Sequence, residues 1–114
     1  MRRPELTKQP DEEGFYQAAR VNEVSQDNFF PLEINGRQIL ITKHQGRYFA
    51  FNASCPHASG NLAEGQLYKG RIDCPVHAYR FDVTTGTTLW PPDEPVRLKR
   101  YPTKLKGDYV LVKL

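Results

Sequence analysis

Cysteine is scarce in this chain, and long hydrophobic runs are missing. Two of the 114 residues are cysteines, which could close at most one bridge, so the sequence does not fit a disulfide-stapled secreted scaffold. No apolar run comes near the ~18 residues that a transmembrane helix needs, and the mean hydropathy is −0.64. The N-terminal residues also lack the apolar segment of a secretory signal. We therefore expect a soluble, cytoplasmic protein that does not enter a membrane.

Helical patterns are lacking as well. No window longer than a few residues repeats its apolar side chains with a helical period, and eight glycines and nine prolines break the chain into short segments. The length sets an expectation of one domain with one core, too small for a catalytic barrel. These features predict an all-β domain.

Short strand-like segments separated by turn signals are present near both ends of the chain. Residues 29–34 and 37–43 flank Asn35-Gly36, which predicts a β-hairpin because a type I′ turn needs positive φ at both central residues. Residues 47–51 continue this pattern as a third antiparallel strand. Residues 96–103 and 109–113 predict a further hairpin.

The chain therefore divides into a tail, a base and an insertion. Residues 1–14 have no structural period and are expected to be a loose tail, followed by one domain over 15–114. Within it, 15–50 and 96–114 carry the strand patterns and are expected to form the base. Residues 51–95 form a loop-rich insertion between them.

Both cysteines lie in the insertion, each with a histidine close behind it. Cys55-Pro56-His57 is followed, after sixteen intervening residues, by Cys74-Pro75-Val76-His77. Two such turns supply four metal ligands, Cys₂His₂. Structural zinc sites take two like ligands from each knuckle, whereas a [2Fe–2S] centre with two Cys on one iron and two His on the other takes one of each from each loop. The spacing favours the second, while mononuclear zinc or iron, or no metal, stay open.

The paired motifs resemble those of the soluble Rieske-type ferredoxins over about residues 15–114. Further positions that match are Leu62 and Gly65 after the first motif, Phe81-Asp82 and Thr85-Gly86 after the second, and Pro91-Pro92, where the family has a proline loop covering the cluster. The resemblance implies the Rieske iron–sulfur fold: an antiparallel basal barrel or sandwich with a small cluster-binding β subdomain. It also implies one [2Fe–2S] cluster per chain.

By that resemblance, the thiolates of Cys55 and Cys74 would ligate the inner iron, and His57 and His77 would ligate the outer iron through Nδ1. Two positions depart from the family pattern. Ala78 stands where a glycine usually follows the second histidine, and Ser59 replaces a glycine of the first loop. The bridging cysteines of the Rieske proteins in cytochrome complexes are also missing, so metal and packing alone would hold the loops.

The potential and the function follow from the same comparison. High-potential members donate hydrogen bonds to the cluster from a serine and a tyrosine, where this chain has Tyr79 and Phe81, so we expect a potential toward the low end of the range from about −150 to +300 mV.

The resemblance implies a one-electron carrier between a reductase and an acceptor such as a terminal oxygenase, not itself an enzyme and expected to be a monomer. The alternatives are a non-catalytic Rieske-like small subunit of a larger reductase and a zinc-stabilised interaction domain.

The remaining residues are assigned to packing or to docking. The net charge of +3 includes a basic stripe, either a solvated strand face or a docking surface for an acidic partner protein, with no sign of nucleic-acid binding. His44 is expected at a surface turn, and Trp90 beneath the proline loop. The stripe consists of Arg97, Lys99, Arg100, Lys104 and Lys106.

Overall fold

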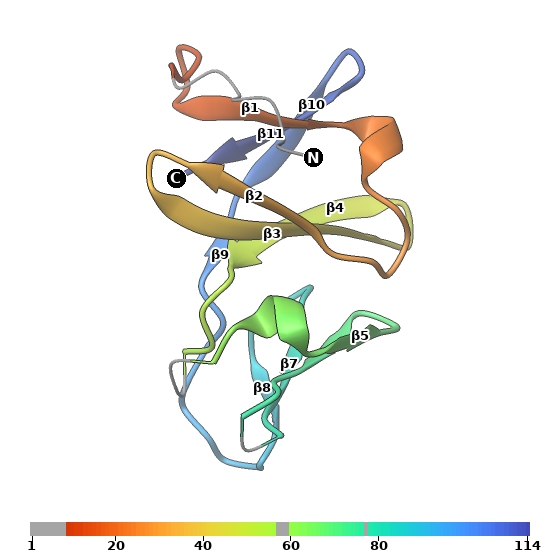
Figure 1. Ribbon diagram of the computed structural model, residues 1–114, viewed down its shortest axis with the longest axis vertical. Coiled ribbons are helices and arrows are strands. Elements are labelled where there is room, and N and C mark those ends of the chain that lie inside the picture. The colour runs from red at the N-terminus through yellow and green to blue at the C-terminus, as the bar shows by residue number, and fades with distance from the viewer. Residues whose placement is uncertain (1–8, 57–59, 77) are drawn as a thin grey trace.

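The computed structural model describes residues 9–56, 60–76 and 78–114, which form three antiparallel sheets stacked along the long axis (Figure 1). The first sheet has the order β1-β11-β10, with β1 at Phe15–Arg20, β10 at Thr103–Lys106 and β11 at Tyr109–Lys113. The second has the order β2-β3-β4-β9, with β2 at Phe30–Ile34, β3 at Arg37–His44, β4 at Arg47–Asn52 and β9 at Arg100–Tyr101. The third has the order β5-β6-β7-β8, with β5 at Gln66–Tyr68, β6 at Arg71–Asp73, β7 at Arg80–Asp82 and β8 at Thr88–Trp90.

Two 3₁₀ turns, η1 at Val21–Glu23 and η2 at Leu62–Glu64, are the helical elements of the described residues. None of the helices in this part of the chain is long and apolar enough to cross a membrane. The all-β class predicted from the sequence is confirmed.

The predicted meander forms β2, β3 and β4. Asn35 and Gly36 have φ values of 50° and 82°, so the Asn-Gly turn takes positive φ at both central residues, as a type I′ turn requires. In β2, buried Phe30, Leu32 and Ile34 alternate with exposed residues, because successive side chains of a strand point to opposite faces.

In the sheet of β2, β3, β4 and β9, the central strands β3 and β4 have buried side chains on both faces. Ile39, Ile41 and Ala50 belong to a core shared with β1 and β11, whereas Leu40 and Phe51 belong to a second core shared with the third sheet. Leu40 pairs with Phe51 in the β3–β4 register, so the two side chains that face the third sheet are neighbours. One layer therefore connects both cores.

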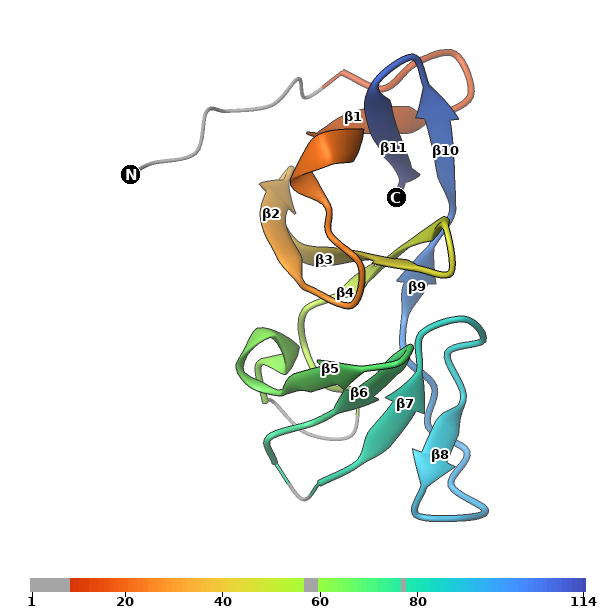
Figure 2. The same ribbon diagram turned by 90° about the vertical axis from the view of Figure 1, so that its right-hand side faces the viewer.

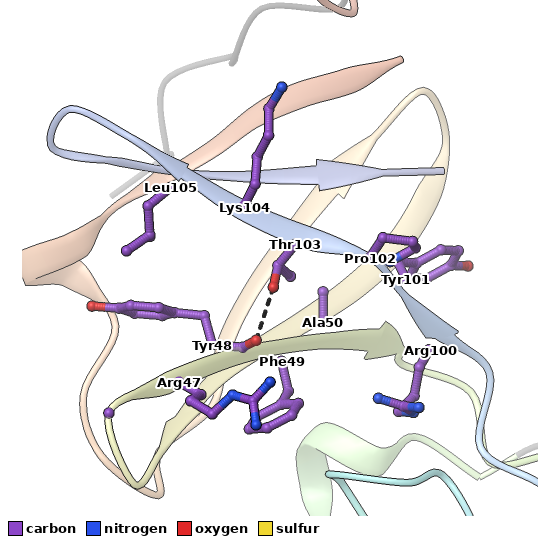
Figure 3. Close-up of a pocket in the computed structure, with 11 residues that line it drawn as sticks. Arg47, Tyr48, Phe49, Ala50, Arg100, Tyr101, Pro102, Thr103, Lys104 and Leu105 are labelled. Atoms are coloured by element: carbon purple, nitrogen blue, oxygen red, sulfur yellow. Dashed lines mark hydrogen bonds between the residues drawn. The ribbon is translucent and has the colours of Figure 1, made fainter. Parts of the chain in front are cut away.

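Both ends of the chain close the first core. Strand β1 pairs with β11, and β11 pairs with β10, so the N-terminal and C-terminal segments lie in one sheet (Figure 2). Between β4 and β10 an open groove of about 390 Å³ remains, and the Thr103 hydroxyl crosses it to donate to the Tyr48 carbonyl at 2.9 Å (Figure 3).

Two details differ from the sequence-based expectation. Residues 96–99 carry no strand, and the long strand expected there begins as β9 at Arg100. Of the expected tail, residues 1–8 lie outside the described residues, and Asp11 accepts from the backbone N–H groups of Glu13 and Phe15 and pairs with Lys104 at 2.7 Å. The Lys104 ammonium lowers the pKa of Asp11 to about 2. The turn at 11–14 is thus attached to the first sheet.

The second and third sheets also meet at a polar joint. The Asp27 carboxylate accepts from the backbone N–H of Gly70 at 3.3 Å and lies 3.2 Å from Nδ1 of His44. The His44 ring covers Gly70, so that a Cβ there would approach Nε2 at 2.8 Å. His44 ends β3 beside the Gln45-Gly46 turn, as expected, but its side chain is only 13% exposed, so the expected surface position is wrong. The contact joins positions far apart in the sequence, which local patterns do not reveal.

This joint predicts unequal costs for two glycine substitutions. Gly70 and Gly36 have similar φ values, +79° and +82°, but only Gly70 has heavy atoms within 4 Å of an added Cβ. Gly36→Ala should lower the free energy of unfolding by about 1–2 kcal/mol through its left-handed backbone. Gly70→Ala should cost a further ~1–3 kcal/mol because His44 must move. Urea unfolding of the two variants measures the difference, and equal losses would contradict the joint.

Candidate metal centre

The first predicted ligand loop follows β4 and is closed at its base by backbone hydrogen bonds. Ser54 and Asn61 form an antiparallel bridge, and the Cys55 N–H donates to the Gly60 carbonyl at 2.9 Å. The Asn61 side chain then accepts from the Ala63 N–H and caps η2. These bonds fix the position of Cys55 at the start of the loop.

The second loop lies at the end of a hairpin in the third sheet. Strands β6 and β7 pair antiparallel, and the Cys74 N–H donates to the Tyr79 carbonyl at 2.7 Å. Inside the loop, the Val76 N–H donates to the Cys74 sulfur at 3.4 Å. The second cysteine therefore begins a closed loop, as the first one does.

The two loops bring their cysteine thiols together. Cys55 is 4% and Cys74 is 3% exposed, both are free, and both belong to the second core. Burial, with the neighbouring thiol as a second cause, raises the pKa of Cys74 to about 11. Cys74 would release its proton on binding a metal as a thiolate.

Two glycines allow the loops to approach. A Cβ on Gly60 would lie 2.8 Å from a methyl carbon of Val76 and 3.5 Å from the Cys74 sulfur. A Cβ on Gly65 would clash with the carbonyl oxygen of Asp73 and would lie 3.1 Å from Pro75. No local pattern in the sequence indicates these close contacts, although Gly65 is a matched family position.

The predicted histidine ligands, His57 and His77, lie outside the described residues, as does Ser59. Their ligand roles therefore stay predictions. Ala78 is described, and its φ of 56° places it in the left-handed region. An alanine thus takes the conformation that glycine favours at this position of the family.

Next to the second loop, residues 91–95 form a proline-rich segment, here called the proline segment. Glu94 accepts a hydrogen bond from the Tyr79 hydroxyl at 2.9 Å, which raises the pKa of Tyr79. Trp90 is 50% exposed, so its predicted position beneath this segment is wrong. The link between Tyr79 and Glu94 spans fifteen residues, and no motif in the sequence indicates it.

The described part of the site fits an iron–sulfur cluster. Thiolates are the protein ligands on one iron of a Rieske centre, and backbone N–H donors to the sulfurs are typical of such sites. Cys55 and Cys74 supply an adjacent pair of buried sulfurs, and Val76 supplies a backbone donor.

Comparison with known proteins identifies the family. The Rieske [2Fe-2S] domain model matches residues 14–102. The chain is 30% identical over 97 residues to the ferredoxin component of naphthalene 1,2-dioxygenase/salicylate 5-hydroxylase systems from Ralstonia sp, covering 85% of this chain and 92% of the relative. It is 33% identical over 100 residues to the biphenyl dioxygenase ferredoxin subunit of Pseudomonas sp. strain KKS102, covering 86% and 90%.

The fold agrees with this assignment. The ferredoxin of carbazole 1,9a-dioxygenase from Nocardioides aromaticivorans IC177 superimposes with a TM-score of 0.78 at 23% identity, covering 87% of this chain and 96% of that one. The chain therefore belongs to the Rieske [2Fe-2S] domain family, which is defined by an iron–sulfur cluster.

The close approach at Gly65 gives a test of the site's packing. Gly65→Ala should lower the free energy of unfolding by roughly 1–3 kcal/mol or more, because the Asp73 backbone must move to admit the methyl group. The backbone of Gly65 has a φ of −85°, so an alanine there carries no left-handed strain of its own. Urea unfolding compares the variant with the wild type, and a Gly65 variant as stable as the wild type would contradict the close contact.

Proposed function

We propose that this protein is a soluble one-electron carrier that passes electrons from a reductase to an acceptor such as the terminal oxygenase of a multicomponent system. One [2Fe–2S] cluster per chain would be held by four ligands. The observation that carries the proposal is the buried pair of free thiols from two hydrogen-bonded loops. The ligands would be Cys55, His57, Cys74 and His77.

When bound, the cluster supplies reversible one-electron redox chemistry. The chain's own residues set its surroundings. Burial of Cys55 and Cys74 keeps water from the sulfurs, and the Val76 N–H donates to the Cys74 sulfur. The Tyr79 hydroxyl donates to Glu94, and Phe81 has no donor, which supports a potential toward the low end of the Rieske range.

The separation of the fold into a base and a cluster-binding part supports the same function. We propose that 15–50 and 96–114 act as a rigid base and that 51–95 carry the cluster. The two loops rest on Phe51, Leu62 and Phe81, which are fully buried in the second core. A rigid site reduces the structural rearrangement that accompanies a change in charge. The monomeric state and the cytoplasmic location remain part of this proposal.

Partner docking is proposed at a basic patch made of Arg97, Lys99 and Arg100, all exposed. The segment is held on both sides, since Arg97 bridges to Thr87 and the Lys99 carbonyl accepts from the Asn52 N–H. Lys104 of the predicted stripe is already paired with Asp11 and Glu13, and it points away from Arg47 and Arg100 (Figure 3). The patch therefore lies where the second and third sheets meet.

The proposal extends what is known of similar proteins. The relatives are named as ferredoxin components of dioxygenase systems, and a complex of reduced oxygenase and oxidized ferredoxin in carbazole 1,9a-dioxygenase contains a similar fold, with a TM-score of 0.80 at 21% identity. An acceptor of that kind would fit a carrier of this size.

Removing single ligands tests the assignment of the site. Cys74→Ser and His57→Ala should each abolish the iron content and the visible colour, because a cluster held without a bridging disulfide has no substitute for a lost ligand. The control is His44→Ala, at the joint outside both loops, which should retain iron. Iron analysis measures the iron content, and far-ultraviolet circular dichroism checks that each variant keeps its β structure. Full iron content in the His57 variant would remove that residue from the ligand set.

Charge reversal tests the docking patch. Replacing Arg97, Lys99 and Arg100 by Glu should slow reduction by the reductase component of a naphthalene dioxygenase system at low salt, because surface charge steers association. Without electrostatic attraction between the two proteins, their association rate falls by about 10-fold or more. The control reverses three exposed charges elsewhere, at Arg37, Lys106 and Lys113.

Stopped-flow reduction at several salt concentrations measures the effect, which should shrink as salt rises. A patch variant and a control variant with the same rate would remove the docking role.

A further inference from the structure

We infer that Glu94 is a positioning residue that clamps the proline segment to the second ligand loop and thereby controls how firmly that loop retains iron. The inference rests on the proposed function and concerns residues that are not themselves proposed as ligands.

The carboxylate of Glu94 joins two segments. Its Oε2 accepts from the Tyr79 hydroxyl at 2.9 Å, and its Oε1 lies 3.4 Å from the Val96 N–H, which donates to it. One oxygen therefore contacts the ligand loop, and the other contacts the chain just beyond the proline segment. Both side chains are partly buried, so water competes less for these bonds than it would at an exposed site.

The composition of the proline segment explains why a side chain makes this link. Three of its five residues, Pro91, Pro92 and Pro95, have no backbone N–H to donate. The segment therefore has few backbone groups with which to bind the neighbouring loop, and a carboxylate supplies two acceptor oxygens instead.

Tyr79 connects Glu94 to Cys74, one of the proposed ligands. Its carbonyl accepts the Cys74 N–H at 2.7 Å, which closes the second loop. Its ring lies against Phe81, with centroids 6.2 Å apart, and Phe81 is fully buried. Tyr79 is therefore held at its ring by Phe81 and at its backbone by Cys74. If its hydroxyl lost Glu94, the change would reach Cys74 through this backbone bond.

The far end of the proline segment is also anchored. The Thr88 hydroxyl donates to the Val96 carbonyl at 2.5 Å, so Val96 is bonded through both its N–H and its carbonyl. The clamp therefore connects the loop to a fixed point rather than to a free strand end. Releasing it should open the space between the loop and the segment without unfolding the third sheet.

The test uses the iron-loaded protein and three variants. Tyr79→Phe removes the hydroxyl and keeps the ring, Glu94→Ala removes the acceptor, and the double variant removes both. Each single variant should lose iron to a chelator about tenfold faster than the wild type, the order expected for a lost hydrogen bond to a charged group. The double variant should be no faster than the faster single one, because both remove the same bond.

Two remote variants serve as matched controls. Tyr16→Phe removes a hydroxyl that accepts from Asn35 at 3.1 Å, and Glu33→Ala removes an acceptor of Gln38 at 2.9 Å. Both should release iron at the wild-type rate. Wild-type rates in Tyr79→Phe and Glu94→Ala, or a double variant whose effect is the product of the two single effects, would overturn the clamp.

A second measurement does not depend on iron. Amide hydrogen exchange of a peptide covering 88–97 should be faster in Tyr79→Phe than in the wild type and unchanged in Tyr16→Phe, because the clamp restrains this segment. Unchanged exchange in the Tyr79 variant would contradict the clamp. A protein that binds no iron but shows faster exchange would instead contradict the proposed function and leave the clamp standing.

Discussion

The burial of one sheet on both faces is the constraint on which the rest of the structure depends. In the layer of β2, β3, β4 and β9, Ile39 and Ile41 face one core, while Leu40 faces the other. A strand that is buried on both sides has apolar side chains at consecutive positions, as Ile39, Leu40 and Ile41 of β3 show. Its register cannot slip by one residue without moving Leu40 to the wrong core, so the third sheet and the site receive a fixed support.

From this support the chain builds a site out of two loops that are far apart in sequence. The first continues directly from β4, and the second joins β6 to β7 in the third sheet. Gly60 and Gly65 let the loops approach, and Cys55 and Cys74 lie in one buried cluster. In the proposed site, the fold would hold two buried cysteines, each at the start of a closed loop.

The sequence predicted the features that depend on local chemistry. The Asn35-Gly36 turn and the meander were accessible, because turn residues act over short distances, whereas the shared role of Cys55 and Cys74 came from the family resemblance. The joint of Asp27 with Gly70 and the link from Tyr79 to Glu94 were not accessible, since they connect segments that only the folded chain brings together. Trp90 was misplaced for a related reason: an aromatic beside prolines does not reveal which side of a strand faces water.

We expect the two loops to hold one redox-active cluster of two irons. Iron, acid-labile sulfide and zinc measured in the purified protein, combined with a count of the electrons taken up on anaerobic reduction, test this directly. We expect two irons, two sulfides and no zinc per chain, with one electron accepted. A protein that contains one zinc, lacks sulfide and accepts no electron would contradict it.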